Sequence, residues 1–214
     1  MSLSMIEHVR RRVSLCKKIN EVIVATCDKE IFDEVEHFGG KVVITSDRHQ
    51  SCIDRVAEAA SSLKADIIIN VQGDMPLVDP DSLEALVKPL MQDKKIQYTD
   101  MIAPISDKSD INNPNIVKVV FNKTCDAIYY SREAIPSMKI NTNHKQTYFM
   151  QLGINAFRKS SLEHFFNLER TPLELIESVD MLRLLENNCY IRTVTTASPA
   201  LGVDTPEDLE RVSD

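Results

Sequence analysis

The sequence has few cysteines, and their spacing excludes the common cysteine sites. The five are scattered, with no Cys-x-x-Cys pair and no histidine at ligand spacing, which favours free thiols in a reducing compartment. No apolar run approaches the roughly 20 residues that cross a bilayer. The first residues also lack the apolar core of a secretory signal. We therefore expect a cytoplasmic protein without a membrane partner.

An excess of positive charge is also missing. The chain carries 25 Lys and Arg against 32 Asp and Glu, a net charge of −7. This balance argues against a nucleic-acid partner, which would require many phosphate contacts. It leaves room for a local site that binds a small anion. The basic residues Arg10 to Arg12 lie within an amphipathic pattern and are read as a solvated helix face.

The apolar pattern alternates between helix and strand along 214 residues. The run 66–71 is apolar on both faces, which is typical of a parallel strand covered by helices. The predicted fold class is α/β, with a mostly parallel sheet, helices on both faces and an antiparallel insertion. Predicted helices cover 5–18, 28–38, 51–63, 159–168 and 172–187, with another beginning near 80; predicted strands cover 21–26, 41–45, 66–71, 115–122, 126–131, 148–157 and 190–195.

A glycine and a carboxylate follow the strand at 66–71. Gln72, Gly73 and Asp74 would lie at the carboxyl end of that strand, where ligands bind in open α/β sheets. Asp74 has two readings, a turn or helix-capping residue and a ligand-binding carboxylate. Gly73 favours the second, because a glycine lets the backbone approach a ligand closely.

The same design recurs near the C terminus, where Gly202 and Val203 precede Asp204 and Thr205. Either Asp204 or Thr205 could simply cap the following helix. Two carboxylates at strand ends could also share Mg²⁺, which takes one or two carboxylates and fills its other positions with water and phosphate. Asp74 and Asp204 are therefore the predicted metal ligands and catalytic residues, if the fold brings them together.

Seven segments in order resemble the 3-deoxy-manno-octulosonate cytidylyltransferase (CMP-Kdo synthetase) family. The most specific are NVQGDMPLV (70–78) and GVDTPEDLERV (202–212). The others are HQSCIDRV (49–56), NNPNIVKVV (112–120), AIYYSREAIP (127–136), QLGINAFR (151–158) and TPLELIESVDMLRLL (171–185).

The resemblance implies a Rossmann-like nucleotidyltransferase that joins CTP to an acidic 3-deoxy sugar in lipopolysaccharide precursor synthesis. It implies one domain over 5–214, with an insertion at 112–158 that contributes to the sugar pocket and the contact of a homodimer. The sugar's anomeric hydroxyl attacks the α-phosphate and pyrophosphate leaves, with Mg²⁺ on Asp74 and Asp204. The implied nucleotide-binding residues are Ser51, Arg55 and Gly73; the implied substrate-binding residues are Gln72, Arg132, Gln151, Asn155 and Asp180.

The chain departs from the family pattern in two ways. It begins after the segment that matches the family's first strand and its Arg-, Lys- and Gly-rich phosphate loop, so we expect open sheet edges and a weakened triphosphate site. Gln151 and Asn155 also stand where the family has His and Tyr, and Cys52 stands where it has Gly. These changes keep open an amino-substituted Kdo or a sialic-acid-like sugar, and the missing loop keeps open a non-catalytic binding or assembly partner.

Overall fold

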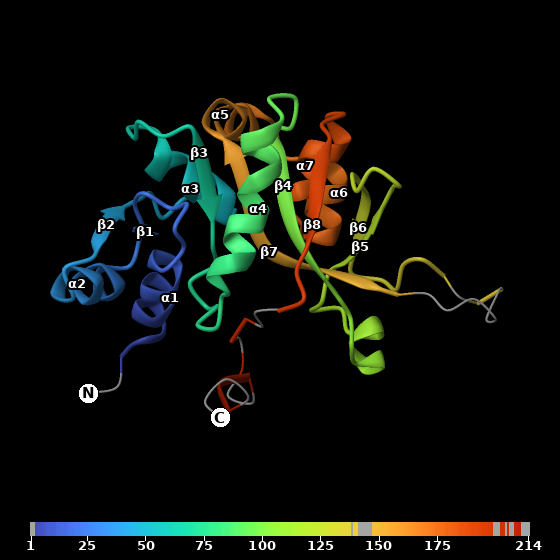
Figure 1. Ribbon diagram of the computed structural model, residues 1–214, viewed down its shortest axis with the longest axis horizontal. Coiled ribbons are helices and arrows are strands. Elements are labelled where there is room, and N and C mark those ends of the chain that lie inside the picture. Colours follow the sequence, from blue (N-terminus) through green and yellow to red (C-terminus); the bar gives the residue numbers. More distant parts are fainter. Residues whose placement is uncertain are drawn as a thin grey trace.

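The computed structural model describes residues 3–137, 139–140, 147–198, 202–203, 205 and 208–210. Helices and strands alternate along most of the chain (Figure 1). The α-helices are α1 (Met5–Ser14), α2 (Lys29–His37), α3 (Cys52–Ala60), α4 (Pro80–Gln92), α5 (Lys159–Asn167), α6 (Pro172–Glu177) and α7 (Met181–Glu186), with a 3₁₀ turn at Lys108–Asn112. The strands are β1 (Ile23–Thr26), β2 (Lys41–Ile44), β3 (Ile67–Asn70), β4 (Tyr98–Pro104), β5 (Lys118–Phe121), β6 (Ala127–Ser131), β7 (Phe149–Arg158) and β8 (Ile191–Thr195).

The strands form two sheets. β1 and β2 pair in parallel, and the six-stranded sheet has the order β6-β5-β7-β4-β8, with β3 also pairing with β7. Within the described part of the chain, β1 has no strand partner besides β2, and β3 has none besides β7. The prediction of a mixed α/β fold is confirmed, but the mostly parallel sheet was wrong. β7 runs antiparallel to β3, β4 and β5, and the parallel pairs among the described strands are β1–β2 and β4–β8.

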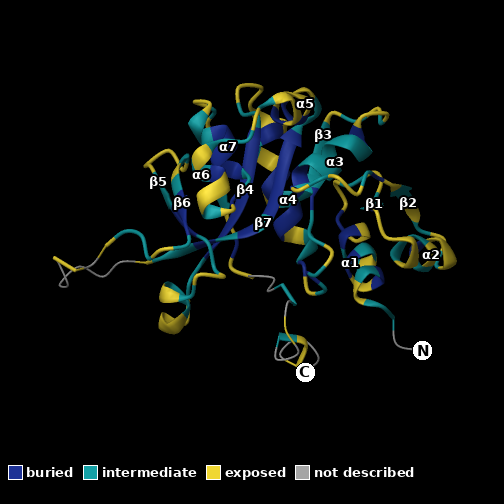
Figure 2. Cartoon of the chain, turned by 180° about the vertical axis from the view of Figure 1, so that it is seen from behind, coloured by how far each residue is buried: buried dark blue, intermediate teal, exposed yellow. Residues whose placement is uncertain are grey.

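The long strand β7 explains this error. It lies within the predicted insertion at 112–158, yet it occupies the centre of the six-stranded sheet. In the part of the chain that the structure describes, it pairs antiparallel with β3, β4 and β5 and not with β6, the strand before it, so neither its direction nor its partners follow from a local pattern. Figure 2 shows β4 and β7 as the most continuous buried strands of the molecule. The apparent insertion therefore supplies part of the core.

Helices cover both faces of this sheet. On one face, α1 and α4 contribute Val13, Leu83 and Leu86 to an apolar cluster with Met101 of β4. On the other face, α3, α5 and α7 pack Ile53, Phe165, Leu182 and others against Tyr98 and Ile102 of β4. Alternate β4 residues thus point to opposite clusters, as the two-residue period of a strand requires. No described helix is long and apolar enough to span a membrane.

The predicted helix at 172–187 is two helices. Ser178 has a left-handed backbone, with φ of 53°, and ends α6. The chain then turns through Asp180 into α7. Left-handed conformations are uncommon outside glycine, so nothing in the sequence signals this break. It brings Asp180 to a helix junction instead of the side of one continuous helix.

Candidate active site

A row of polar side chains crosses the sheet face that carries the α3, α5 and α7 cluster. Asn70 lies opposite Asn155 in the β3–β7 pair, and Asp100 lies opposite Asn155 in the β4–β7 pair. Asp100 points to the same face as Tyr98 and Ile102, and it is completely buried. Since β3, β7 and β4 are adjacent, these residues form a continuous polar floor. We call Asn70, Gln72, Asp100, Gln151 and Asn155 the polar row.

A bulge in β7 brings two of these residues to one carboxylate. Asp100 pairs with Asn155 and Ile102 pairs with Gln151, so β7 has three residues between the two pairs where β4 has one. Gly153, with φ of 71°, lies in the middle of this bulge. The extra residues bend β7, as bulges do. As a result, the amides of Gln151 and Asn155 both donate to Oδ1 of Asp100, Gln151 at 3.2 Å.

Beside Gly153, the edge of β7 is hydrogen-bonded by side chains instead of by a neighbouring strand. β3 pairs with β7 only as far as Asn155, and β5 pairs with it from Met150. The Gly153 carbonyl between these stretches accepts from the amides of Asn70 (3.5 Å) and Gln72 (3.4 Å). A buried carbonyl needs such a partner. The gap between β3 and β5 is therefore where the polar row reaches the edge of the sheet.

The N-terminus of α3 and the α6–α7 junction form a wall beside the row. Ser51 caps α3 by accepting from the backbone N–H of Ile53, and its hydroxyl donates to Asp180 at 2.7 Å. Cys52 also donates to Asp180, at 3.6 Å, and its sulfur accepts from Gln72 at 3.2 Å. Burial raises the pKa of Asp180 against the lowering effect of the Ser51 bond. One network thus joins the predicted residues Ser51, Gln72, Gln151, Asn155 and Asp180 through Asn70, Cys52 and Asp100.

The state of the Cys52 thiol gives a direct test of this wall. Burial, together with the nearby Asp180, raises the pKa of Cys52 to about 11. Alkylating reagents attack the thiolate, which at pH 8 is then roughly one part in a thousand. We expect iodoacetamide at pH 8 to label the exposed Cys27 and Cys125 readily and to leave Cys52 at least about tenfold slower. Peptide mass spectrometry of timed samples measures the three rates; equal labelling of Cys52 would contradict the wall as described.

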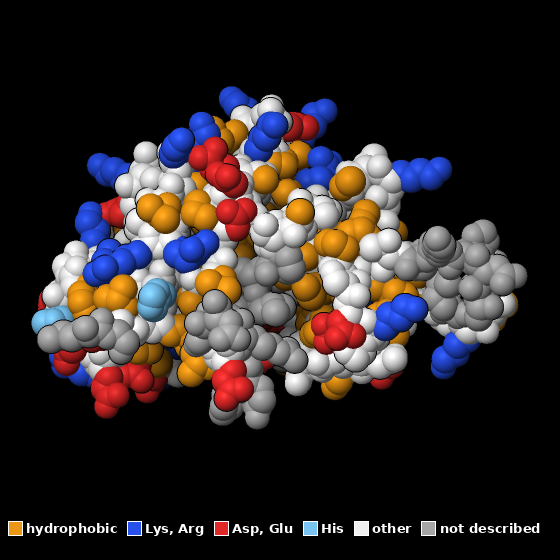
Figure 3. Space-filling model, turned by 60° about the horizontal axis from the view of Figure 1, so that its bottom comes forward, with side chains coloured by type: hydrophobic (Ala, Val, Ile, Leu, Met, Phe, Trp, Pro, Cys, Tyr) orange, Lys and Arg blue, Asp and Glu red, His pale blue; other side chains and the backbone are white. Residues whose placement is uncertain are grey.

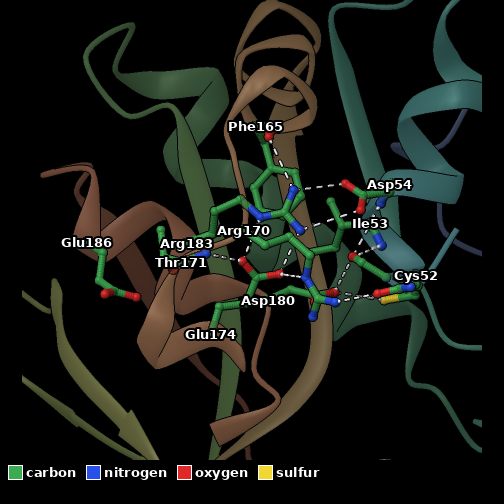
Figure 4. A network of polar contacts seen from close by, with 12 residues as sticks. Cys52, Ile53, Asp54, Phe165, Arg170, Thr171, Glu174, Asp180, Arg183 and Glu186 are labelled. Atoms are coloured by element: carbon green, nitrogen blue, oxygen red, sulfur yellow. Dashed lines mark hydrogen bonds and ion pairs between the residues drawn. The ribbon is translucent and has the colours of Figure 1, made fainter. Parts of the chain in front are cut away.

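A buried ion network holds this wall in place (Figure 4). Arg183 of α7 donates to Glu174 of α6 at 2.7 and 2.9 Å and to Asp54 of α3 at 3.0 Å. Its guanidinium also lies 4.1 Å from the centre of the Phe165 ring. Asp54 is in the first turn of α3, and Arg183 follows Asp180 by three residues. The network therefore fixes the two elements that carry Ser51 and Asp180 relative to each other.

Asp74 lies beyond Gln72, against the C-terminal segment. Its backbone carbonyl accepts from the N–H of Val203 at 2.9 Å. A Cβ on Gly202 would lie 3.7–3.8 Å from the Asp74 carboxyl atoms, so the missing side chain leaves space beside that carboxylate. Asp74 thus lies beside Gly202, and its sharing of Mg²⁺ with Asp204 stays a prediction. Asp204 itself is outside the described residues.

This arrangement fits a hard cation such as Mg²⁺ at Asp74. The donor is a carboxylate, and the glycine beside it leaves room that a side chain would fill. No cluster of three or more His, Cys, Asp and Glu suited to a metal occurs within the described ranges. Mg²⁺ does not require one, since water and substrate phosphates complete its coordination. Asp74 and Asp204 remain the predicted ligands.

Two of the predicted nucleotide-binding residues, Arg55 and Gly73, make contacts within the protein. Arg55 donates to Thr45 and to the Ser46 carbonyl, which holds the β2–α3 loop. Gly73 packs against α1, where a Cβ would meet Ile6 at 3.1 Å. The structure thus gives Arg55 and Gly73 internal partners, and their predicted contact with a nucleotide stays a prediction.

Arg132 is also held from within the protein. Its guanidinium donates to the carbonyls of Glu177 and Ser178 at the end of α6, and to that of Pro114. A cation at a helix C-terminus is favourable, because carbonyl groups there lack helical partners. Arg132 therefore supports the α6–α7 junction, and a direct contact with the sugar stays a prediction.

Two members of the polar row were missed by the sequence analysis. Asn70 ends an Ile-Ile-Ile strand, and Asp100 is the one charged residue of β4, which is buried on both faces. A single acid or amide inside an apolar run could have marked both residues as candidates, because burying a polar group is costly and needs a structural or functional reason. The strand at 98–104 was itself not predicted, so its aspartate was not among the candidate site residues.

The end of the molecule with the C-terminal segment is seen in Figure 3. Over the described part of that face, basic and acidic side chains are interspersed with hydrophobic ones. A nucleic-acid interface would instead gather Lys and Arg into one stripe or patch.

Comparison with known proteins decides the family. The cytidylyltransferase family model matches residues 1–194. The 3-deoxy-manno-octulosonate cytidylyltransferase of Syntrophus aciditrophicus is 40% identical over 213 residues, covering 98% of this chain and 86% of the relative. The chain belongs to this cytidylyltransferase family. The protein of the same name from Geobacter metallireducens is 38% identical over 217 residues, covering 97% of this chain and 85% of its own.

Solved structures agree with this assignment. A CMP:2-keto-3-deoxy-manno-octonic acid synthetase complexed with CTP has a TM-score of 0.90 and 36% identity, covering 97% of this chain and 85% of that one. The 4-diphosphocytidyl-2C-methyl-D-erythritol synthase of Anaerococcus prevotii, at 14% identity and a TM-score of 0.63, shares the fold. The family predicted from seven sequence segments is confirmed.

Proposed function

We propose that this cytidylyltransferase joins CTP to Kdo or a closely related acidic 3-deoxy sugar, giving the CMP-sugar and pyrophosphate for lipopolysaccharide precursor synthesis in the cytoplasm. The observation that carries the proposal is the polar row: its side chains cross β3, β7 and β4 beside a wall that contains Ser51 and Asp180, and Asp74 follows Gln72 of the row by two residues. The relative solved with CTP bound and the names of the similar proteins support the same reaction.

In this reaction the oxygen of the sugar's anomeric hydroxyl forms a bond to the α-phosphorus. The bond from that phosphorus to the bridging oxygen of pyrophosphate breaks, and the hydroxyl proton is released. Mg²⁺, when bound, supplies positive charge that stabilises the phosphate oxygens. The polar row hydrogen-bonds the sugar and fixes its orientation, and correct placement of two reactants accounts for much of the rate in such transfers.

The polar row also bears on which sugar is used. Gln151 and Asn155 replace an imidazole and a phenol of the family pattern, and both are tied to a buried carboxylate. Polar groups that lose their partner on binding the wrong substrate give strong discrimination. Kdo, an amino-substituted Kdo and a sialic-acid-like sugar therefore form the test panel.

Pyrophosphate release from CTP and Mg²⁺, followed with each sugar in turn, tests the proposal. We expect release that depends on the sugar, with one member of the panel giving a kcat/KM at least about tenfold above the others. Release without any sugar would be CTP hydrolysis and would contradict a transferase. No release with any of the three from folded protein would favour the non-catalytic homologue.

A further inference from the structure

A carboxylate at the centre of the sheet organises the polar row. Asp100 of β4 is fully buried, and its Oδ1 accepts hydrogen bonds from the amides of Gln151 and Asn155. Burying a carboxylate is costly, and here the groups that act on it are two neutral amides and the neighbouring Tyr130 phenol instead of a cation. The free-energy cost of burying Asp100 therefore indicates that this carboxylate has a function.

The carboxylate fixes which way each amide points. An amide has a donating and an accepting end, and only the donating NH₂ can face a carboxylate. Asn155 therefore gives its NH₂ to Asp100 and turns its oxygen to Asn70, which donates to it at 3.3 Å. At the other end of the network, Asp180 accepts from Ser51 and Cys52, and the Cys52 sulfur accepts from Gln72. Carboxylates at both ends thus set the direction of the whole network.

The free end of Gln151 is set in the same way. One N–H of its amide donates to Asp100, which turns the NH₂ toward that carboxylate and leaves the carbonyl oxygen as the end directed toward a ligand. Gln151 is only partly buried, whereas Asn155 is buried and has both ends engaged. The side chain at the surface of the row is therefore presented as a hydrogen-bond acceptor. It suits a sugar that offers a hydroxyl or amino donor at this position.

On the basis of the function proposed above, we propose that Asp100 is a positioning residue for sugar recognition, which orients the Gln151 and Asn155 amides so that the row reads a hydrogen-bond donor on the sugar. Asp100 acts through these amides and does not touch the substrate. Neither the family segments nor the sequence pattern singled it out.

The protonation of Asp100 gives this role a signature. Burial raises the pKa of Asp100 to about 7, opposed by the nearby Tyr130 hydroxyl and by the hydrogen bonds from Gln151 and Asn155. Tyr130 of β6 is the titratable group that faces it among the described residues, and its own pKa is raised well above the ordinary value by burial and by Asp100. On β8, the residue paired with Asp100 is the uncharged Thr193. Protonation below pH 7 removes the charge that holds the two amides, because hydrogen bonds to an ionised acceptor are stronger.

Two substitutions at Asp100 separate orientation from packing. Asp100→Leu removes the acceptor, and we expect the KM for the sugar to rise at least about tenfold while the KM for CTP stays within about twofold. Asp100→Asn keeps one accepting oxygen without the charge. At pH 6 the sugar KM of this variant should stay within about threefold of the wild-type value. Between pH 6 and pH 8 the sugar KM of the wild type should fall severalfold, and that of Asp100→Asn should not. Met101→Leu, the next residue on β4 but facing the opposite apolar cluster, is the matched control and should change neither KM.

Side-chain amide NMR resonances of Gln151 and Asn155 provide a readout that does not depend on activity. We expect both NH₂ signals to move between pH 6 and pH 8 in the wild type and to stay fixed in Asp100→Asn. Folded Asp100→Leu with an unchanged sugar KM, or amide signals that ignore pH in the wild type, would overturn the proposal. If the wild type shows no sugar-dependent turnover, the proposed function fails, and the orienting role of Asp100 is decided by the amide signals alone.

Discussion

Asp74→Asn is expected to lower kcat for CMP-sugar formation by about 10²–10³-fold. The exchange keeps the size of the side chain and removes its negative charge. An amide is a weaker ligand for Mg²⁺ than a carboxylate, so the concentration of Mg²⁺ needed for half-maximal rate should rise as well. The KM for the sugar should change much less, because the polar row lies on the sheet and not at Asp74. Initial rates over a series of Mg²⁺ concentrations measure all three quantities.

Asp79→Asn is the matched control. Asp79 lies five residues further along and caps α4 by accepting from the backbone N–H of Ser82. Asparagine is also a good N-cap, so this variant should keep its rate within about twofold. If the rate of Asp74→Asn stayed within about threefold of the wild-type rate at saturating Mg²⁺, Asp74 would not be a metal ligand.

The largest effect on folding is expected from Arg183→Met. Methionine fills much of the same volume but leaves Glu174 and Asp54 without their shared cation. Breaking a buried ion pair from one side costs about 3–5 kcal/mol of unfolding free energy, because the remaining charge stays buried. Glu174 keeps its bond from Arg170, so we expect a loss of about 3 kcal/mol, the lower end of this range. Urea unfolding measures the loss. Lys29→Met is the matched control, since its pair with Asp33 is exposed and should contribute less than about 1 kcal/mol.

The effect of Arg183→Met should depend on pH. Burial of Glu174 would raise its pKa, but the bonds from Arg183 and Arg170 hold that pKa below the ordinary 4.5. A depressed acid pKa stabilises the folded state above the unfolded value and ceases to do so as pH falls through the folded value. The difference between wild type and variant should thus be largest at neutral pH and shrink below pH 4.5. A difference that does not change with pH would place the effect in packing.

The sequence predicted those features that depend on interactions between residues close together in the chain. The helix predicted at 28–38 is present as α2, and Asp28 caps it by accepting from the N–H of Glu30. Thr205, one of the two candidate caps near the C terminus, exchanges hydrogen bonds with Asp208. In both places the polar side chain and the N–H that it serves are two or three residues apart. Sequence alone contains that relation.

Features that depend on distant partners were not predicted. The strand 98–104 is buried on both faces and has no alternating pattern to mark it. The direction of β7 follows from its pairing with β3, β4 and β5, which are far away in the chain. The motifs identified Gln151 and Asn155 as candidates, but the bulge at Gly153 that turns both toward Asp100 is a property of the paired strands. Arg132 and Arg55 were interpreted as ligand contacts because their carbonyl partners lie in other segments.

The account rests most heavily on the transfer of a cytidylyl group to a sugar, and ³¹P NMR of one reaction mixture tests it most directly. With CTP, Kdo and Mg²⁺ present, we predict that the CTP signals fall while one phosphodiester signal and the pyrophosphate signal grow in equal molar amounts. The mixture without sugar should keep its CTP. Loss of CTP without a phosphodiester, or a spectrum that stays unchanged with every sugar of the panel, would contradict the account.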